Sequence, residues 1–351
     1  MHTHTHTHTH THTKNQPIKN LFIRIAYACA VLLMLEGCQG CRRGAVAPDL
    51  SERGIQTVTT NLGGIPNLGN TCYMNSVLQI IAKLYPDTFA GKADSLAQAG
   101  QKIVERIKND QDYVIRDEAE AFYTALLGAS RGEFIRGRQE DAEAFLTILF
   151  EKSAFQPFYF AWHQMISIKG IIRNYEAWRK ETEPTVGSLK IPLPDNGNVT
   201  MQARLEAMFE DAALENLYQE PLLGEVDRTK RDRLKINTNS NAPLPIQLRR
   251  FNWEGNRGGK KIETTITGTL NLTVPARIQY SPDGRVNDLN YCLQGFIVHI
   301  GSRLYSGHYV AYIQQNGQWR LYNDDKVSQV TPAQALKAAG KAYLYFYRRT
   351  P

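Results

Sequence analysis

The sequence predicts an α+β fold in which helices come first and strands follow. Two observations support this prediction. In the first half of the chain, apolar residues recur three and four positions apart, the spacing of a helix with one buried face. From Leu244 onward, apolar residues alternate with polar ones or form short β-prone runs, which is typical of strands. Helices followed by strands indicate the α+β class.

The composition is that of a globular chain. Apolar residues make up 42% and charged residues 21% of the 351 residues, with 17 Tyr and 13 Phe. This length allows one large domain. Lys and Arg outnumber Asp and Glu by 41 to 34, but the excess is scattered and forms no basic block. We therefore expect no nucleic-acid partner.

Two helical segments stand out in the first half. One begins at Cys72 and runs toward Leu84, and the other surrounds Phe145. Their apolar residues at helical spacing are Met74, Val77, Leu78 and Ile81 in the first segment and Ala142, Phe145, Leu146 and Leu149 in the second. Each segment is therefore predicted to bury one face.

Several short segments of the second half are predicted strands. They lie at 244–248, 296–300, 309–313, 319–322 and 342–347. Asn316 and Gly317 separate two of these strands. Because the Asn-Gly pair accepts positive φ angles, it predicts a tight hairpin turn.

The N-terminal segment carries targeting features rather than a fold. Residues 1–13 alternate His and Thr, a low-complexity tract that is either a weak metal binder or a solvated tail or tag. Lys14 and Lys19 precede an apolar run at 21–35, whose uninterrupted part is shorter than the ~20 residues of a membrane span. The run therefore predicts a signal peptide. Residues 35–38 also resemble a bacterial lipoprotein box ending in Cys38, which would anchor the chain to a membrane.

The chain is thus divided into three parts. Residues 1–41 hold the His-Thr tract and the signal peptide or lipoprotein-type anchor, 42–62 form a linker without periodicity, and 63–349 form the folded domain. Of the five cysteines, only Cys72 and Cys292 fall in that domain. Cys38 and Cys41 have the CxxC spacing of a redox or zinc site, but no second pair completes four ligands.

Cys72 is a candidate nucleophile because it begins a predicted helix. The free N–H groups and dipole of a helix N-terminus stabilise a thiolate. Thr71 is a suitable N-cap. A lone cysteine at a helix start is more often a small core residue, so the position alone is suggestive only.

A base and a group that orients it follow later in the chain. His308 lies between Gly307 and a predicted strand, where small neighbours leave the imidazole accessible. Asn323, Asp324 and Asp325 come just after the next strand, one hairpin away. A thiol nucleophile needs such a base, and the base needs an amide or carboxylate that holds its tautomer. Alone, the histidine is more often structural and the acidic stretch a solvated turn. Their order after the cysteine favours catalysis.

Four segments together resemble the ubiquitin-specific proteases (peptidase family C19). Residues 64–79, Gly-Ile-Pro-Asn-Leu-Gly-Asn-Thr-Cys-Tyr-Met-Asn-Ser-Val-Leu-Gln, are similar to the cysteine box of this family almost residue for residue. Residues 306–312, with Trp319 and 322–327, resemble its histidine box. Gln139, Asp141 and the following apolar residues resemble a segment of its helical thumb, and 244–251 resemble a strand of its palm. The four boxes span about 64–348.

The resemblance implies a role for each matching residue. Cys72 would be the nucleophile, His308 the base and then the acid, and Asn323 the group that orients the imidazole, with Asp324 as the fallback. Asn67 would supply an oxyanion donor beside the Cys72 backbone N–H. The residues expected to contact the substrate are Gln139, Asp141, Gly307 and Tyr309. No metal and no cofactor is implied.

The resemblance also implies a papain-like cysteine protease fold with a helical thumb, a β-sheet palm and fingers. Most members of the family hold zinc in the fingers with two CxxC pairs, but this sequence has no cysteine between Cys72 and Cys292. The interval 152–242 is also short, so we expect reduced, metal-free fingers. Residues 139–144, Gln-Glu-Asp-Ala-Glu-Ala, depart from the usual Gln-Gln-Asp-Ala-x-Glu, which weakens the expectation for Gln139 and Asp141.

The function implied by the resemblance is that of a deubiquitinase, with ubiquitin or ubiquitinated proteins as partners. The alternatives are a ubiquitin-binding module without catalysis, a protease for a ubiquitin-like modifier, and a general papain-like peptidase. With the N-terminal segment, the expectation is a secreted or membrane-anchored protein. A signal peptide on a deubiquitinase suggests a bacterial effector that acts on proteins of a eukaryotic host.

Overall fold

The computed structural model of the chain describes residues 59–152, 160–169, 174–179, 187–210, 212–220, 224–236, 241–251, 261–280, 284–304 and 306–351, with backbone alone for 160–179 and 212–231. The predicted His-Thr tract, the signal peptide or anchor and most of the predicted linker lie outside these residues. No helix within the described ranges is long and apolar enough to cross a membrane.

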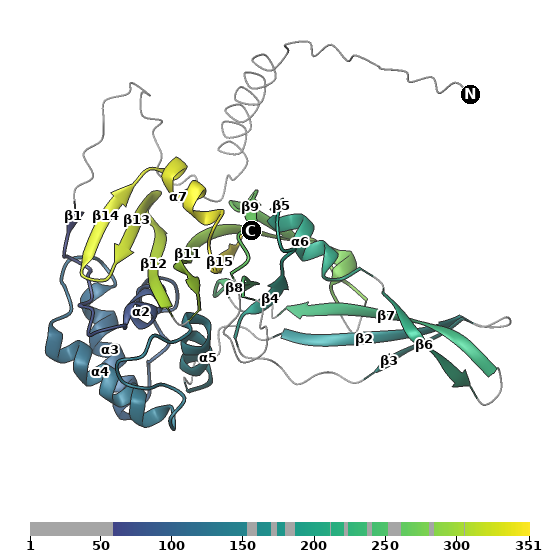
Figure 1. Cartoon of the computed structure of the whole chain (residues 1–351), viewed down its shortest axis with the longest axis horizontal. Coiled ribbons are helices and arrows are strands. Elements are labelled where there is room, and N and C mark those ends of the chain that lie inside the picture. The colour runs from purple at the N-terminus through teal and green to yellow at the C-terminus, as the bar shows by residue number, and fades with distance from the viewer. Residues whose placement is uncertain are drawn as a thin grey trace, which may run out of the picture. The chain divides into compact units, whose positions relative to one another are not determined.

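Four helices form the first half of the domain, and two of them lie where the apolar spacing predicted a helix. They are α2 (Cys72–Leu84), α3 (Ser95–Ile107), α4 (Arg116–Ala129) and α5 (Ala142–Lys152). Helix α2 begins and ends where the sequence placed it, and it packs against α3 and α5. Most of its side chains are buried, since it also packs against the sheet. Figure 1 shows these helices gathered on one side of the strands.

The strands of the second half form a sheet of nine strands among the described residues, in the order β1-β14-β13-β12-β11-β15-β8-β4, with β10 also paired to β11. Their bounds are β1 (Thr59–Thr60), β4 (Leu189–Pro192), β8 (Leu244–Arg249), β10 (Asn271–Val274), β11 (Leu289–Arg303), β12 (Ser306–Gln315), β13 (Gln318–Asn323), β14 (Lys326–Val330) and β15 (Leu344–Arg349). All the predicted strands are present, which confirms the α+β class. Strand β1 pairs with β14, so ordered structure begins before the predicted end of the linker at residue 62.

The hairpin that joins β12 to β13 confirms the turn prediction. Gln315 pairs with Gln318, which leaves Asn316 and Gly317 as a two-residue loop. Their φ angles are 50° and 80°, both in the left-handed region that this turn requires. The short loop fixes the register of the two strands, and that register places the start of β12 beside the end of β13.

Four strands in the interval between α5 and β8 form a second sheet. It contains β2 (Phe160–Lys169), β3 (Asn174–Arg179), β6 (Ala212–Glu220) and β7 (Gly224–Ile236), in the order β3-β2-β7-β6. The interval that the sequence marks as short, and from which we expected reduced fingers, therefore forms a four-stranded sheet. Among the side chains that the structure describes, no group of three or more His, Cys, Asp or Glu is placed to hold a metal ion.

The remaining elements are short. They are β5 (Asn198–Thr200), α6 (Met201–Ala207), β9 (Thr265–Thr267), the 3-10 helix η2 (Ala276–Ile278) and α7 (Pro332–Ala339). Helix α7 begins with a capping box, in which the Thr331 hydroxyl accepts from the Gln334 N–H and the Gln334 side chain accepts from the Thr331 N–H. This pattern stabilises the first turn of a short helix.

Arg250 is a charged residue in the protein interior. The sequence places it in the palm-strand segment 244–251 but does not predict its burial. It is 1% exposed, and its guanidinium donates to four backbone carbonyls. Nε donates to Ala342 (2.6 Å), one terminal nitrogen to Ile262 (3.2 Å) and Thr264 (2.8 Å), and the other to Gly340 (3.2 Å). The five-donor fork of arginine therefore holds the segment after β8 to the loop that leads into β15.

Candidate active site

The loop before α2 is organised by the side chain of Asn67. Its Oδ1 accepts hydrogen bonds from the Gly69 N–H (2.9 Å) and the Thr71 N–H (3.3 Å). The Thr71 hydroxyl in turn accepts from the Leu68 N–H (2.9 Å). Thr71 therefore occupies the N-cap position without capping the helix with its side chain, which differs from the prediction because the hydroxyl is used inside the loop. The loop delivers Cys72 to the first position of α2.

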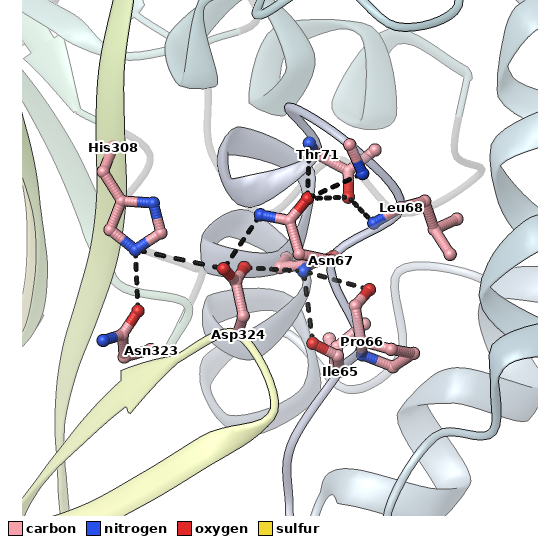
Figure 2. A network of polar contacts seen from close by, with 10 residues as sticks. Ile65, Pro66, Asn67, Leu68, Thr71, His308, Asn323 and Asp324 are labelled. Atoms are coloured by element: carbon pink, nitrogen blue, oxygen red, sulfur yellow. Dashed lines mark hydrogen bonds and ion pairs between the residues drawn. The ribbon is translucent and has the colours of Figure 1, made fainter.

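His308 and Asn323 meet because β12 and β13 are neighbours. The pairing of Ala311 with Tyr322 brings the start of β12 close to the end of β13. His308 Nε2 lies 2.6 Å from Asn323 Oδ1. Figure 2 shows the two side chains facing each other. Because an amide oxygen only accepts, Nε2 carries the hydrogen of this bond, and Nδ1 is left for the thiol.

The pKa of His308 is raised to about 9, mainly by a hydrogen bond with Cys72 and further by the bond to Asn323 and the charge of Asp324. Desolvation opposes this shift. The imidazole is therefore held in its protonated form around neutral pH. An imidazolium beside a thiol favours the thiolate, which is the reactive species of cysteine.

Asp324 connects the β13–β14 turn to the loop before α2, as Figure 2 shows. Its Oδ2 accepts from Asn67 Nδ2 (2.9 Å) and lies 3.9 Å from His308 Nε2. Its Oδ1 accepts from Asn75 Nδ2 (2.8 Å). The Asp324 carbonyl accepts from the Ile65 N–H (2.9 Å). The carboxylate thereby fixes which way the Asn67 amide points, with its oxygen toward the loop and its nitrogen toward Asp324.

Gln139 and Gly307 are in direct contact and line a pocket that includes the residue before His308. Gln139 Oε1 accepts from the Gly307 N–H (2.9 Å). The pocket has a volume of about 370 Å³ and is lined by Asn70, Arg138, Gln139, Ser306 and Gly307. Gln139 is 8% exposed, and its Nε2 has no hydrogen-bond partner within the described part of the chain. The two residues thus form a polar wall next to the histidine.

The side chains of Asp141 and Tyr309 do not line this pocket. The Asp141 carboxylate accepts from the Tyr343 hydroxyl (2.9 Å) and from the Glu143 N–H (2.9 Å), and burial is the main cause that raises its pKa to about 6. Tyr309 is 0% exposed, and its ring packs against His299 with a centroid distance of 4.7 Å. A substrate contact through the Tyr309 side chain does not fit this burial, because successive residues of a strand point to opposite faces.

Two residues of the site were not singled out by the sequence. Asn75, one turn into α2, is 1% exposed and reaches both Asp324 and the Ile65 carbonyl (3.2 Å). His299 is 1% exposed, and a Cβ on Gly307 would lie 2.9 Å from its Nε2. Burial lowers the pKa of His299 to about 4, so this imidazole is neutral. Asn75 was detectable as a polar residue at helical spacing from Cys72, but nothing local pointed to His299.

Comparison with known proteins decides the family. A model of the ubiquitin carboxyl-terminal hydrolase family matches residues 63–347. The chain belongs to this family. Ubiquitin carboxyl-terminal hydrolase 25 of Arabidopsis thaliana is 27% identical over 322 residues, which cover 82% of this chain and 47% of that protein. Ubiquitin carboxyl-terminal hydrolase 13 of Mus musculus is 45% identical over 74 residues, 20% of this chain and 8% of that protein. The chain therefore spans less than half the length of these family members.

Solved structures show the same fold. A SAGA DUB module with Ubp8, Sgf11, Sus1 and Sgf73, bound to ubiquitin aldehyde, superposes with a TM-score of 0.63 at 19% identity and covers 96% of this chain and 77% of that chain. A second such module, bound to monoubiquitin, gives a TM-score of 0.65 at 20% identity, with 96% and 76% covered. These similarities confirm the papain-like fold that the sequence led us to expect for this member of the family.

Proposed function

We propose that this member of the family is a cysteine-type deubiquitinase that hydrolyses the isopeptide or peptide bond after the C-terminal glycine of ubiquitin. The observation that carries the proposal is the placement of Cys72 at the start of α2 against His308, whose far nitrogen is held by Asn323. Family membership over residues 63–347 supports it, and so do the names of its relatives.

The nucleophile of this reaction is the Cys72 thiolate, paired with the His308 imidazolium. The thiolate attacks the carbonyl carbon of the terminal glycine, and a C–S bond forms while the carbonyl oxygen takes the negative charge. Asn67 Nδ2 has a second N–H beyond the one it gives to Asp324. The Cys72 backbone N–H is at the first position of α2, where a helix supplies no intrahelical acceptor. These two donors stabilise the oxyanion.

His308 then completes both halves of the reaction. As an acid it gives its Nδ1 proton to the departing lysine amine, and the C–N bond breaks to leave a thioester. As a base it takes a proton from water, which attacks the thioester; the C–S bond breaks, the carboxyl group of ubiquitin loses its proton to solvent, and the thiolate is restored beside the imidazolium. Throughout, the Asn323 oxygen holds Nε2–H and keeps the ring in the orientation that these transfers need.

The pocket beside His308 is where we place the end of the ubiquitin tail. Gly307 has a φ of 149° and no side chain, so an extended backbone can approach it. In this structure the Gly307 N–H donates to the Gln139 side chain. When a ubiquitin tail enters the pocket, Gly307 and Gln139 exchange this hydrogen bond for hydrogen bonds to the backbone of the tail. Ubiquitin in the complexes of Ubp8 supports the choice of partner.

The test is covalent labelling with a ubiquitin that carries a thiol-reactive group at its C-terminus. We expect an adduct with the wild-type chain and with Cys292→Ala, which replaces the other buried cysteine, but none with Cys72→Ala. Labelling only by a probe built on a ubiquitin-like modifier would assign the chain to that modifier. Binding of ubiquitin without an adduct would indicate a module that has lost catalysis, and cleavage of casein without a response to ubiquitin would indicate a general peptidase.

We further propose that the N-terminal segment directs export, so that the protein is secreted or membrane-anchored and acts as an effector on host proteins. The apolar run at 21–35 and the box ending in Cys38 support this proposal. Membrane fractionation of the full chain and of Cys38→Ser tests it. Loss of membrane association in the variant alone would indicate lipidation. Recovery of both proteins outside the producing cell would indicate secretion, and retention of both in its cytoplasm would contradict export.

A further inference from the structure

Asp110 lies where three elements of the fold meet. It follows α3, while α2 contributes Lys83 and β13 contributes Arg320 and Tyr322. Lys83 Nζ lies 3.1 Å from Asp110 Oδ1. The Tyr322 hydroxyl donates to Asp110 Oδ2 (2.7 Å), and the Arg320 guanidinium donates to the same oxygen. One carboxylate therefore binds groups from two elements that are distant in the sequence.

Lys83 and Asp110 form the part of this cluster that is shielded from water, whereas 35% of the Arg320 side chain is exposed. The exposed fraction is 0% for the Lys83 side chain and 4% for that of Asp110. Lys83 Nζ also donates to Gln79 Oε1 (2.8 Å) and the Ile107 carbonyl (2.8 Å). Removal of one partner from such a buried pair leaves an uncompensated charge. Asp110 is thus required to compensate the buried charge of Lys83.

The backbone is shaped to receive this carboxylate. Asp110 has a φ of 52°, in the left-handed region that Asp and Asn tolerate better than most residues. Gly63 lies against it, and a Cβ on Gly63 would be 2.2 Å from Asp110 Oδ1. Two unusual backbone positions therefore coincide at one side chain.

The elements that Asp110 joins are those that carry the reacting groups. Helix α2 begins with Cys72, and β13 ends with Asn323, which directly follows Tyr322. Because neighbouring strand residues point to opposite faces, Tyr322 anchors β13 from behind while Asn323 reaches His308 in front.

We propose that Asp110 is a positioning residue, which fixes β13 against α2 and thereby sets the Asn323 amide at hydrogen-bonding distance from His308. This inference rests on the proposed function and deepens it. Asp110 touches neither the substrate nor the reacting atoms. When its contacts are weakened, Asn323 moves relative to the imidazole, the proton transfers slow, and the pKa of His308 falls because part of its rise comes from the Asn323 bond.

The experiment compares two variants with two matched controls in the full chain. Tyr322→Phe removes one hydroxyl from Asp110, and Asp110→Asn removes the charge while keeping a residue that accepts positive φ. Tyr347→Phe on β15 is the first control, since the buried Tyr347 hydroxyl donates to the Thr269 carbonyl (2.7 Å), away from Asp110. Asp112→Asn is the second control, since it lies in the same loop with 47% of its side chain exposed.

Each protein is first titrated with the ubiquitin probe, so that kcat refers to the active fraction alone. We expect kcat to fall about tenfold in Tyr322→Phe, the equivalent of losing one hydrogen bond, with KM unchanged. The alkaline limb of the rate profile should move to lower pH. Asp110→Asn should show a larger fall in kcat. Both controls should keep the wild-type kcat and the wild-type alkaline limb of the pH–rate profile, even where their melting temperatures drop.

A lower melting temperature in Tyr322→Phe with wild-type kcat and an unmoved alkaline limb would make the cluster purely structural and overturn the inference. The same conclusion would follow if Tyr347→Phe lowered kcat equally. If Asp110→Asn does not fold, Tyr322→Phe decides the matter alone. Failure of the wild-type chain to react with the probe is a separate result, because it refutes the proposed function itself.

Discussion

Replacement of Asp324 by asparagine separates the electrostatic role of this carboxylate from its shape. Asp324 has a φ of 53°, and asparagine accepts this conformation, so the β13–β14 turn should persist. The change removes a negative charge 3.9 Å from His308 Nε2. It also turns one of the two acceptor oxygens into a donor, which faces the amide of Asn67 or of Asn75.

The geometry sets the size of two effects, the loss of a charge near His308 and the loss of an acceptor for the Asn67 amide. Unit charges at about 4 Å interact by about 4 kcal/mol at an effective dielectric constant near 20 and by about 1 kcal/mol in water. Because 34% of the His308 side chain is exposed, solvent screening puts the loss near the lower value, which corresponds to somewhat less than one unit of pKa. Loss of the Asn67 contact costs part of the ~3 to 4 kcal/mol that one oxyanion donor contributes. We expect kcat to fall by about 10- to 100-fold.

The assay is hydrolysis of a fluorogenic amide at the ubiquitin C-terminus between about pH 6 and pH 10. The wild-type rate should decline as the pH rises through about 9, because the imidazolium that protonates the leaving amine then loses its proton. In Asp324→Asn this decline should begin at lower pH. Asp325→Asn is the control, since this neighbouring carboxylate is exposed. The reasoning fails if the two variants share the same kcat and the same alkaline limb.

Three further substitutions test other parts of the structure. Asn67→Ala should lower kcat about 10²- to 10³-fold with little change in KM in steady-state kinetics, and an unchanged kcat would remove Asn67 from the oxyanion site. Gly307→Ala places a Cβ 2.3 Å from the Ile300 carbonyl oxygen at a φ of 149°, so we expect a lower melting temperature and no probe labelling; a variant with wild-type melting and labelling would show that the hairpin is looser than described. Thr331→Ala removes the capping box of α7, and denaturant titration should show a loss of about 1 kcal/mol while kcat stays unchanged. A matching fall in kcat would instead couple α7 to the site.

Local patterns in the sequence were sufficient for the elements that carry the reacting groups. The helix from Cys72 to Leu84 was predictable because its apolar residues recur at helical spacing. The β12–β13 hairpin was predictable because Asn316 and Gly317 accept positive φ. Together with the resemblance to the family, these elements placed Cys72, His308 and Asn323 near one another.

The parts that were not predicted depend on contacts between distant residues. Arg320 and Asp110 are 210 positions apart, and no local pattern reports such a pair. Asn75 fell within the motif that was matched, but its bond to Asp324 depends on how the turn approaches α2. The expectation for Tyr309 ignored the alternation of a strand, by which a residue next to His308 faces the core.

The order of the reacting groups along the chain has a consequence for when the cysteine becomes reactive. His308 follows Cys72 by 236 residues (308 minus 72), and β13 with Asn323 follows later still. A chain made from its N-terminus completes α2 long before these strands exist. Until they dock, the thiol has neither its imidazolium nor the Asn67–Asp324 contact that orients the oxyanion donor. If the proposed function is correct, hydrolysis therefore requires completed folding, and a chain truncated before residue 323 retains Cys72 at the start of α2 without Asn323.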